Sequence, residues 1–306
     1  MQLNIYFTQV MRGKHFIVVS VVAIILLLVL MLKTLSFGSG YSYYWSLLIF
    51  ALIGFVAQMI DGAIGMAYGV FSNSFLLSIG VPPALSSASI HTAEVFTTLA
   101  SGVSHLKLGN VDKKIFRSLI IPGVIGGCLG AYILSSTPLS YTKIVVNIYL
   151  LIMSLVIIAK AVRLTFSGKP SFKGIGLLGG LGGFLDAVGG GGWGPIVSST
   201  LIARNHNPKL AIGSVNLAEF FVTIVESITF FMVLGMIQWE IVLGLALGGL
   251  IAAPLAVYAC KKLSTRLLMA LVGILLMLLT LRNLGAVSYT HLRAHETSLH
   301  LVCRLL

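Results

Sequence analysis

The chain is organised around long apolar runs that contain no Asp, Glu, Lys or Arg. Examples are residues 16–32, 41–60, 144–159 and 267–281. A helix needs ~20 predominantly apolar residues to cross the hydrocarbon core of a bilayer. Several of the runs approach this length, so the pattern predicts an all-α polytopic membrane protein and excludes a soluble one.

The apolar runs belong to an internal repeat. Residues 54–65 and 183–194 share a glycine-rich pattern, and 83–94 and 208–219 each begin with proline and end in Ala-Glu. Further on, 108–109 match 234–235, and 126–132 match 252–258, with an offset of 125 to 129 residues throughout. Conserved order and spacing over this length predict two related halves.

The charges of the loops predict that the two halves are inverted. Residues 107–117 hold four basic residues and their counterpart 235–240 holds none, whereas 135–142 hold none and 261–266 hold three. Residues 80–84 are uncharged, but their counterpart 204–209 contains two basic residues. Basic loops stay in the cytoplasm, so matching loops lie on opposite sides. Inverted repeats recur in secondary transporters.

This pattern divides the chain into five parts. A cytoplasmic end and an extra transmembrane helix (1–40) precede the first repeat (41–160), a basic cytoplasmic connector (161–173) and the second repeat (174–285). Each repeat is expected to contain a glycine-broken helical hairpin (45–79 and 174–203) and three crossings. The expected crossings are 85–106, 115–134, 143–160, 211–234, 241–260 and 267–284.

The two ends of the chain are treated separately. The run at 16–32 follows two basic residues and resembles a signal peptide, but no clear cleavage site follows it, so we expect a retained helix. Residues 286–306 are polar and rich in histidine, which is typical of a non-native tail; a native polar tail is the alternative.

Composition and charge agree with a membrane protein. Hydrophobic residues make up 58% of the chain and charged residues 9%, with a mean hydropathy of +1.03. A net charge of +12 would suit nucleic-acid binding, but the basic residues lie in short loops between apolar runs. We therefore expect a lipid bilayer and no nucleic acid as a partner. Cys128, Cys260 and Cys303 lack metal-ligand spacing.

The glycine-rich hairpins are the first candidate binding element. The run Gly189, Gly190, Gly191, Gly192, Trp193, Gly194 and Pro195 cannot continue an ordinary helix. A half-helix that starts near Pro195 would present free N–H groups and a positive dipole end to an anion. The first half offers a milder version at Asp61, Gly62 and Gly65. Close helix packing through small residues is the alternative.

Five carboxylates lie inside apolar segments: Asp61, Glu94, Asp186, Glu219 and Glu226. Charges at this depth are costly, so such residues are functional candidates. Glu94 and Glu219 are duplicated by the repeat, and each could carry a proton or bind freed backbone N–H groups. Asp61 and Asp186 both lie at the glycine breaks, although the glycine alignment does not make them exact equivalents. Asp186 is a further candidate for either role.

Two polar residues accompany the duplicated glutamates. His91 precedes Glu94 by one helical turn, so both can face one cavity, and Asn216 is the counterpart of His91. A His–Glu pair can bind a metal ion, but no second cluster of ligands is apparent in the sequence. We therefore expect a hydrogen-bonded polar pair that lines the substrate site, with no metal and no cofactor.

The two glycine-rich segments, the paired Ala-Glu motifs and the preceding prolines resemble the TauE/SafE sulfite-exporter family. The resemblance covers roughly residues 45–284 and is most specific at 183–195; residues 61–65 depart from the denser glycine run common in the family. It implies secondary transport of small anions, chiefly sulfite and organosulfonates, across a bacterial cytoplasmic membrane.

These expectations combine into an alternating-access transporter, and not an enzyme. The substrate would be held between the two broken hairpins, without a lysine or arginine inside the spans. A cation transporter, a passive channel and, less favoured, an intramembrane enzyme that uses Glu94 and His91 are the alternatives. The substrate, the direction, the coupling ion and the oligomeric state stay open.

Overall fold

The structure, a computed structural model, describes residues 43–64, 66–162, 170–259, 267 and 269–285. Within these ranges the chain is helical with short connections and contains no strand. The expected helix at 16–32 and the tail at 286–306 lie outside the described residues.

Helices occupy every expected crossing. The first half contains α3 (Tyr43–Ile64), α4 (Tyr68–Ser78), α5 (Pro83–Lys107), α6 (Lys113–Ser136) and α7 (Leu139–Val162). The second contains α8 (Ile175–Gly189), the π-helix η1 (Gly194–Ser198), α9 (Ser199–Ala203), α10 (Pro208–Leu234), α11 (Trp239–Ala259) and a last helix, Met269–Gly285. The prediction of an all-helical protein is confirmed.

Local sequence signals set the helix ends. α5 and α10 each begin with proline, which has no N–H to leave unpaired in the first turn. The side chain of Asp112 caps α6 by accepting hydrogen bonds from the backbone of Lys114 and Ile115. Gly235 ends α10 in the left-handed conformation, φ +68°.

Within the described residues, three helices, α6, α7 and α10, are long and apolar enough to cross a membrane. Their outward faces carry exposed apolar side chains such as Ile121, Ile125 and Leu129 of α6, as expected where lipid is the solvent. By contrast α4 has 11 residues and η1 with α9 only ten. At 1.5 Å per residue each is about 15 Å long, half of the hydrocarbon thickness.

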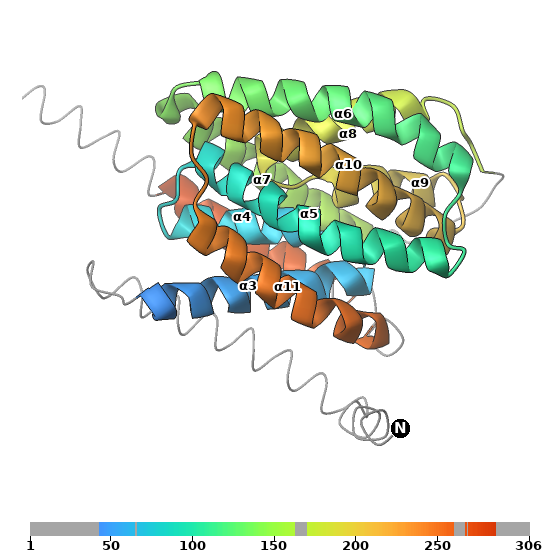
Figure 1. The fold of residues 1–306 in the computed structure, drawn as a ribbon, viewed down its shortest axis with the longest axis horizontal. Helices are drawn as coiled ribbons and strands as arrows, with labels where there is room; N and C mark the ends of the chain where they lie inside the picture. Colours follow the sequence, from blue (N-terminus) through green and yellow to red (C-terminus); the bar gives the residue numbers. More distant parts are fainter. Residues whose placement is uncertain (1–42, 65, 163–169, 260–266, 268, 286–306) are drawn as a thin grey trace, which may run out of the picture.

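The most extensive helix packing joins α3 to α11, α6 to α8, and α10 to both α5 and α6 (Figure 1). Glycines allow these close approaches. A Cβ on Gly54 of α3 would collide with the backbone of Leu245 in α11, and one on Gly183 of α8 with the backbone of Gly123 in α6. Many glycines therefore serve helix packing.

Three of the basic segments expected in the cytoplasm lie together within the described residues, namely those at 107–117, 170–173 and 204–209. The Lys114 ammonium lies 4.1 Å from the centre of the Phe172 ring, and Arg204 Nη1 donates a hydrogen bond to Lys173 O at 2.7 Å. The backbone N–H of Asp112 donates to Ser214 Oγ at 2.7 Å. Loops from both halves and the connector thus meet, while their cytoplasmic side stays a prediction.

Candidate functional site

The second half of the chain is interrupted between α8 and η1. Gly190, Gly191 and Gly192 form this interruption, which we call the second break. Gly190 has φ +64° and Gly191 has φ +136°, a backbone conformation that is strained for any residue with a side chain. The side chain of Asn73, on α4, donates a hydrogen bond to Gly189 O and fills the space where a Cβ on Gly190 would lie. Glycine is therefore required here by conformation and by contact.

Asp186 binds the backbone of the second break. Its Oδ1 accepts hydrogen bonds from the N–H groups of Gly192 at 2.5 Å and Trp193 at 2.8 Å, and its carbonyl oxygen accepts one from Gly191 at 2.9 Å. Two of the N–H groups near the start of η1, which we expected to face an anion, are thus already bound to a carboxylate. A carboxylate at this position stabilises the positive end of the helix.

The first half is interrupted at Met66 and Ala67, the first break. Ala67 has φ +95°, and the carboxylate of Asp61 accepts a hydrogen bond from the backbone of Tyr68. A constant offset of 125 residues pairs Asp61 with Asp186 and Tyr68 with Trp193. Each aspartate thus lies beside the backbone of the paired aromatic residue, which favours this register over the glycine alignment; the equivalence of the two aspartates stays a prediction.

The two breaks touch each other. A Cβ on Gly69 or on Gly191 would collide with the backbone of the other residue. Tyr149 of α7 packs its ring against Gly189 and donates a hydrogen bond to Gly191 O at 3.0 Å. Contacts from both halves, including those of α7, therefore fix the place where the two breaks meet.

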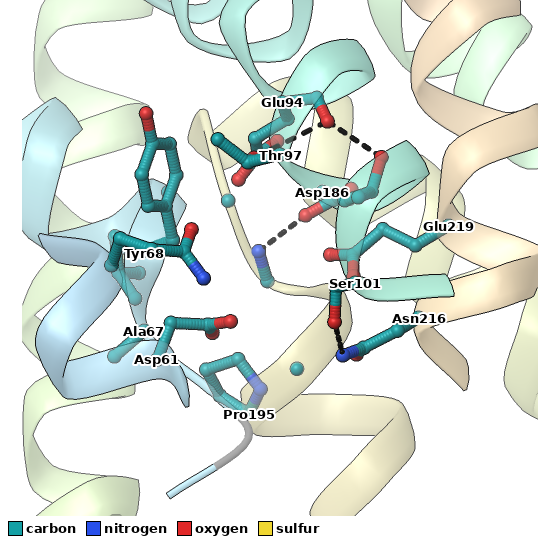
Figure 2. A pocket seen from close by; sticks show the side chains of 17 residues that line it. Asp61, Ala67, Tyr68, Glu94, Thr97, Ser101, Asp186, Pro195, Asn216 and Glu219 are labelled. Atoms are coloured by element: carbon teal, nitrogen blue, oxygen red, sulfur yellow. Dashed lines mark hydrogen bonds between the residues drawn. The ribbon is translucent and has the colours of Figure 1, made fainter. Parts of the chain in front are cut away.

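A pocket opens beside the crossing (Figure 2). It encloses about 410 Å³ of space that no atom occupies, including the part open to its surroundings. Figure 2 shows Asp61 and Glu219 entering it from opposite sides. The lining residues come from both halves: Gln58, Asp61, Ala67, Tyr68, Gly69, Val70, Glu94, Thr97, Thr98, Ser101, Asp186, Gly191, Gly192, Gly194, Pro195, Asn216 and Glu219.

Most of the expected site residues meet at this pocket, but some do not line it. Gly189, Gly190, Trp193 and His91 lie outside the lining. The Trp193 ring is fully buried, packs into the space left by Gly123 and donates from Nε1 to Val215 O at 3.2 Å. Gly62 lies in α3, and Gly65 falls outside the described residues.

Several lining residues were not predicted. Thr97, Thr98 and Ser101 follow Glu94 by three, four and seven positions, which is the spacing of one helix face. That spacing is visible in the sequence and could have identified them. Gln58 and Tyr68 carry no comparable signal, because their orientation depends on the first break.

His91 lies behind the pocket in a buried polar cluster. Its Nδ1 is 2.9 Å from Glu94 Oε2 and 3.2 Å from Glu226 Oε2, and its Nε2 is 3.2 Å from Asp186 O. The polar pair expected from the spacing of His91 and Glu94 is present. The fold also supplies what the sequence did not reveal: His91, Asp186 and Glu226 offer ligand atoms within 4.8 Å of one another.

One basic side chain approaches the site from outside. The Lys160 ammonium, near the end of α7, donates hydrogen bonds to Pro195 O at 2.6 Å and to Ser199 Oγ. Pro195 lines the pocket and Lys160 does not. A lysine therefore holds the start of η1, although none was expected inside the spans.

Comparisons with known proteins identify the family of the chain. The family model described as sulfite exporter TauE/SafE matches residues 49–283. The chain belongs to the TauE/SafE family. A curated relative of Bacillus subtilis (strain 168), "Probable membrane transporter protein YtnM", is 42% identical over 250 residues, which are 78% of this chain and 82% of the relative. No solved structure matches the chain significantly.

TauE/SafE membership confirms the resemblance seen in the glycine-rich motifs and makes the chain a membrane transporter. The matched region begins within α3 and ends within the last helix, so it contains every residue that lines the pocket. The pocket is therefore part of the family's common region.

Proposed function

We propose that this TauE/SafE protein is a secondary transporter that exports a small sulfur oxyanion, such as sulfite or an organosulfonate, across the bacterial cytoplasmic membrane together with protons. One observation carries the proposal: the pocket lies where the two helix breaks cross, and both halves line it. Broken helices at membrane depth are typical of substrate sites in secondary transporters.

The proposal includes two inverted repeats. At an offset of 125 residues α3 corresponds to α8 and α5 to α10, and α6 corresponds to α11 at about the same offset. The packing of α3 on α11 then corresponds to that of α8 on α6, and α5 pairs with its own counterpart. In each of these contacts a helix of one half packs on a helix of the other half. Such contacts between the halves suit a transporter in which one half rocks against the other around a fixed site.

The acidic lining supports a role for protons. Four carboxylates, Asp61, Glu94, Asp186 and Glu219, face the pocket, and its lining contains no lysine, arginine or histidine. An anion would be repelled from four charged carboxylates at this depth. Protonated carboxyl groups instead donate hydrogen bonds to oxyanion oxygens. Anion binding thus requires protons, and the transported unit is the anion with its protons.

The same lining favours one second candidate, a cation transporter. Carboxylate and hydroxyl oxygens are ordinary ligands for hard cations. Counterflow of labelled sulfite separates the two, because a cation transporter does not exchange this anion. A passive channel is separated by counterflow, which only a carrier shows.

The test uses the full chain in proteoliposomes. A thermal-shift screen against sulfite, organosulfonates, thiosulfate and sulfate first selects the anion. We expect labelled sulfite to show counterflow and to be driven by a pH gradient, and Glu219→Gln to abolish the driven flux while the protein stays folded. A wild-type protein that binds none of these anions, or a variant with unchanged pH dependence, would contradict the proposal.

A further inference from the structure

Glu226 is a buried carboxylate that the pocket does not use. It lies on α10, is fully buried and lines no part of the pocket. Neither oxygen of its carboxyl group has a hydrogen-bond partner among the described residues, although Oε2 lies 3.2 Å from His91 Nδ1. A buried carboxyl group without a full set of partners needs an explanation.

The orientation of His91 limits where its protons can be. Nε2 faces the backbone carbonyl oxygen of Asp186, which only accepts, so Nε2 carries a hydrogen. Nδ1 faces two carboxylate oxygens, one from Glu94 and one from Glu226. Without a proton among these three atoms, three lone pairs would face each other in a buried site. At least one proton is therefore shared by Nδ1 and the two carboxylates.

We infer that His91 passes a proton through Nδ1 between Glu94, which lines the pocket, and Glu226, which lies behind it. This inference rests on the proton-coupled transport proposed above. The Glu94 carboxyl O–H gives its proton to Nδ1, leaving a carboxylate and an imidazolium. Nδ1 then gives the proton to Glu226 Oε2, which restores the neutral imidazole. Nε2 keeps its hydrogen on Asp186 O, while the Nδ1–H group turns from Glu94, its hydrogen-bond partner, towards Glu226 Oε2.

The distances suit this transfer. Proton transfer between side chains needs heavy atoms about 2.6–3.2 Å apart. The two contacts of Nδ1 are 2.9 Å and 3.2 Å. Gly127 of α6 leaves the room that the Glu226 carboxyl group occupies, because a Cβ there would collide with Oε1.

Few other titratable groups act on the cluster. Asp186 interacts electrostatically with all three members, and Asp61 with Glu94. Glu219, on α10, interacts electrostatically with Glu94 and Glu226. Tyr68, on α4, interacts with Glu94. Tyr149, on α7, interacts with Asp186. Asp186 is already bound to the second break by two backbone N–H groups, so it is the least suited of the carboxylates to exchange a proton.

The counterpart positions cannot perform this transfer. The offset of 125 residues pairs His91 with Asn216 and Glu226 with Ser101. Asn216 Nδ2 donates a hydrogen bond to Ser101 Oγ at 2.8 Å, so the same two positions meet again, but as a neutral amide and a hydroxyl. Only one of the two contacts can exchange a proton near neutral pH.

The first experiment needs no substrate. Infrared spectra of the purified full chain follow the protonated-carboxyl band while the pH is raised, in wild type, Glu94→Gln, Glu226→Gln and His91→Asn. Groups that share a proton titrate together, so Glu226→Gln should move the midpoint of the Glu94 step by about one pH unit or more. Glu240→Gln, on α11, is the matched control and should not. An unmoved Glu94 step in Glu226→Gln would overturn the inference.

The second experiment tests coupling in proteoliposomes with labelled sulfite. Glu226→Gln and His91→Asn should lower flux driven by a pH gradient about a hundredfold while counterflow continues. Continued gradient-driven flux in Glu226→Gln would overturn the relay and leave the transport function standing. Absence of counterflow in wild type would instead contradict the transport function, while the infrared result still decides on the shared proton.

A metal ion is the remaining occupant to exclude. Calorimetric titration of the purified protein with Zn²⁺ and Mn²⁺ should detect no tight site that depends on His91. A stoichiometric site that His91→Asn removes would overturn the relay and assign His91, Asp186 and Glu226 as ligands.

Discussion

Two contacts between α5 and α10 occupy equivalent positions and differ in chemistry. On one side His91 meets Glu226, and on the other Asn216 meets Ser101; an offset of 125 residues takes His91 to Asn216 and Ser101 to Glu226. The first contact contains two titratable groups next to a third, Glu94, and the second contains none. Under the proposed repeat, the comparison teaches that one helix contact is kept in both halves while titratable side chains occupy only one of the two contacts.

The helix breaks differ in a similar way. At the second break Asp186 Oδ1 binds two backbone N–H groups and the chain turns through two glycines with positive φ; at the first, Asp61 binds the backbone of Tyr68, and Ala67 has positive φ. The second break is therefore held more tightly. The side chains of Asn73 and Tyr149 also contact the second break.

The largest expected effect is at the crossing of the breaks. Gly191→Ala would place a methyl group at φ +136° and against the backbone of Gly69. Backbone strain and overpacking together should lower the free energy of unfolding by about 4 kcal/mol. Gly235→Ala, which also has positive φ but no neighbour, should cost only about 1 kcal/mol. Denaturant unfolding in detergent compares them, and equal losses would contradict the close contact.

The next largest effect distinguishes the two aspartates. Asp186→Ala removes two charge-assisted hydrogen bonds to Gly192 and Trp193 and should cost about 3 kcal/mol. Asp61→Ala removes the one to Tyr68 and should cost about 1.5 kcal/mol. Thermal unfolding of the two variants gives the order. A larger loss in Asp61→Ala would show that the first break, not the second, is held more tightly.

The pairing of Asp61 with Asp186 uses the offset of 125 residues, which the sequence shows for His91 and Asn216 but not for the glycine-rich segments. Apolar runs located the helices within a few residues, because hydropathy is a local property. Glycine and proline located the second break, whereas Asp61 and Gly62, expected at the first break, lie in α3 and the chain is interrupted at Met66 and Ala67. Glycine-rich segments, however, align equally well at several offsets. The hydrogen bonds of Asp61 and Asp186 favour the offset of 125 residues.

The cluster behind the pocket shows the same limit. The spacing of His91 and Glu94 on one helix was enough to place them together. The approach of Glu226 depends on how α10 is rotated against α5, and the burial of Trp193 depends on the space at Gly123 in α6. Both are properties of helix packing, which no single segment encodes.

A third prediction concerns Lys160, whose counterpart at the same offset is Gly285. Its ammonium binds Pro195 O and Ser199, so Lys160→Met should lower the free energy of unfolding by about 2 kcal/mol. Lys160→Arg, which can still donate, should recover part of the loss. Gly285→Ala, with no neighbour near a Cβ, is the control and should not change stability. An unaffected Lys160→Met protein would mean that η1 needs no support from α7.

The smallest expected effect lies at the neutral contact. Ser101→Ala removes the hydroxyl that accepts a hydrogen bond from Asn216, a neutral bond that should contribute about 1 kcal/mol. Because neither group titrates near neutral pH, the pH profile of sulfite flux should keep its shape even where the rate falls. A profile that moves as it does in Glu226→Gln would remove the distinction between the two contacts, since proton coupling would then extend to both halves.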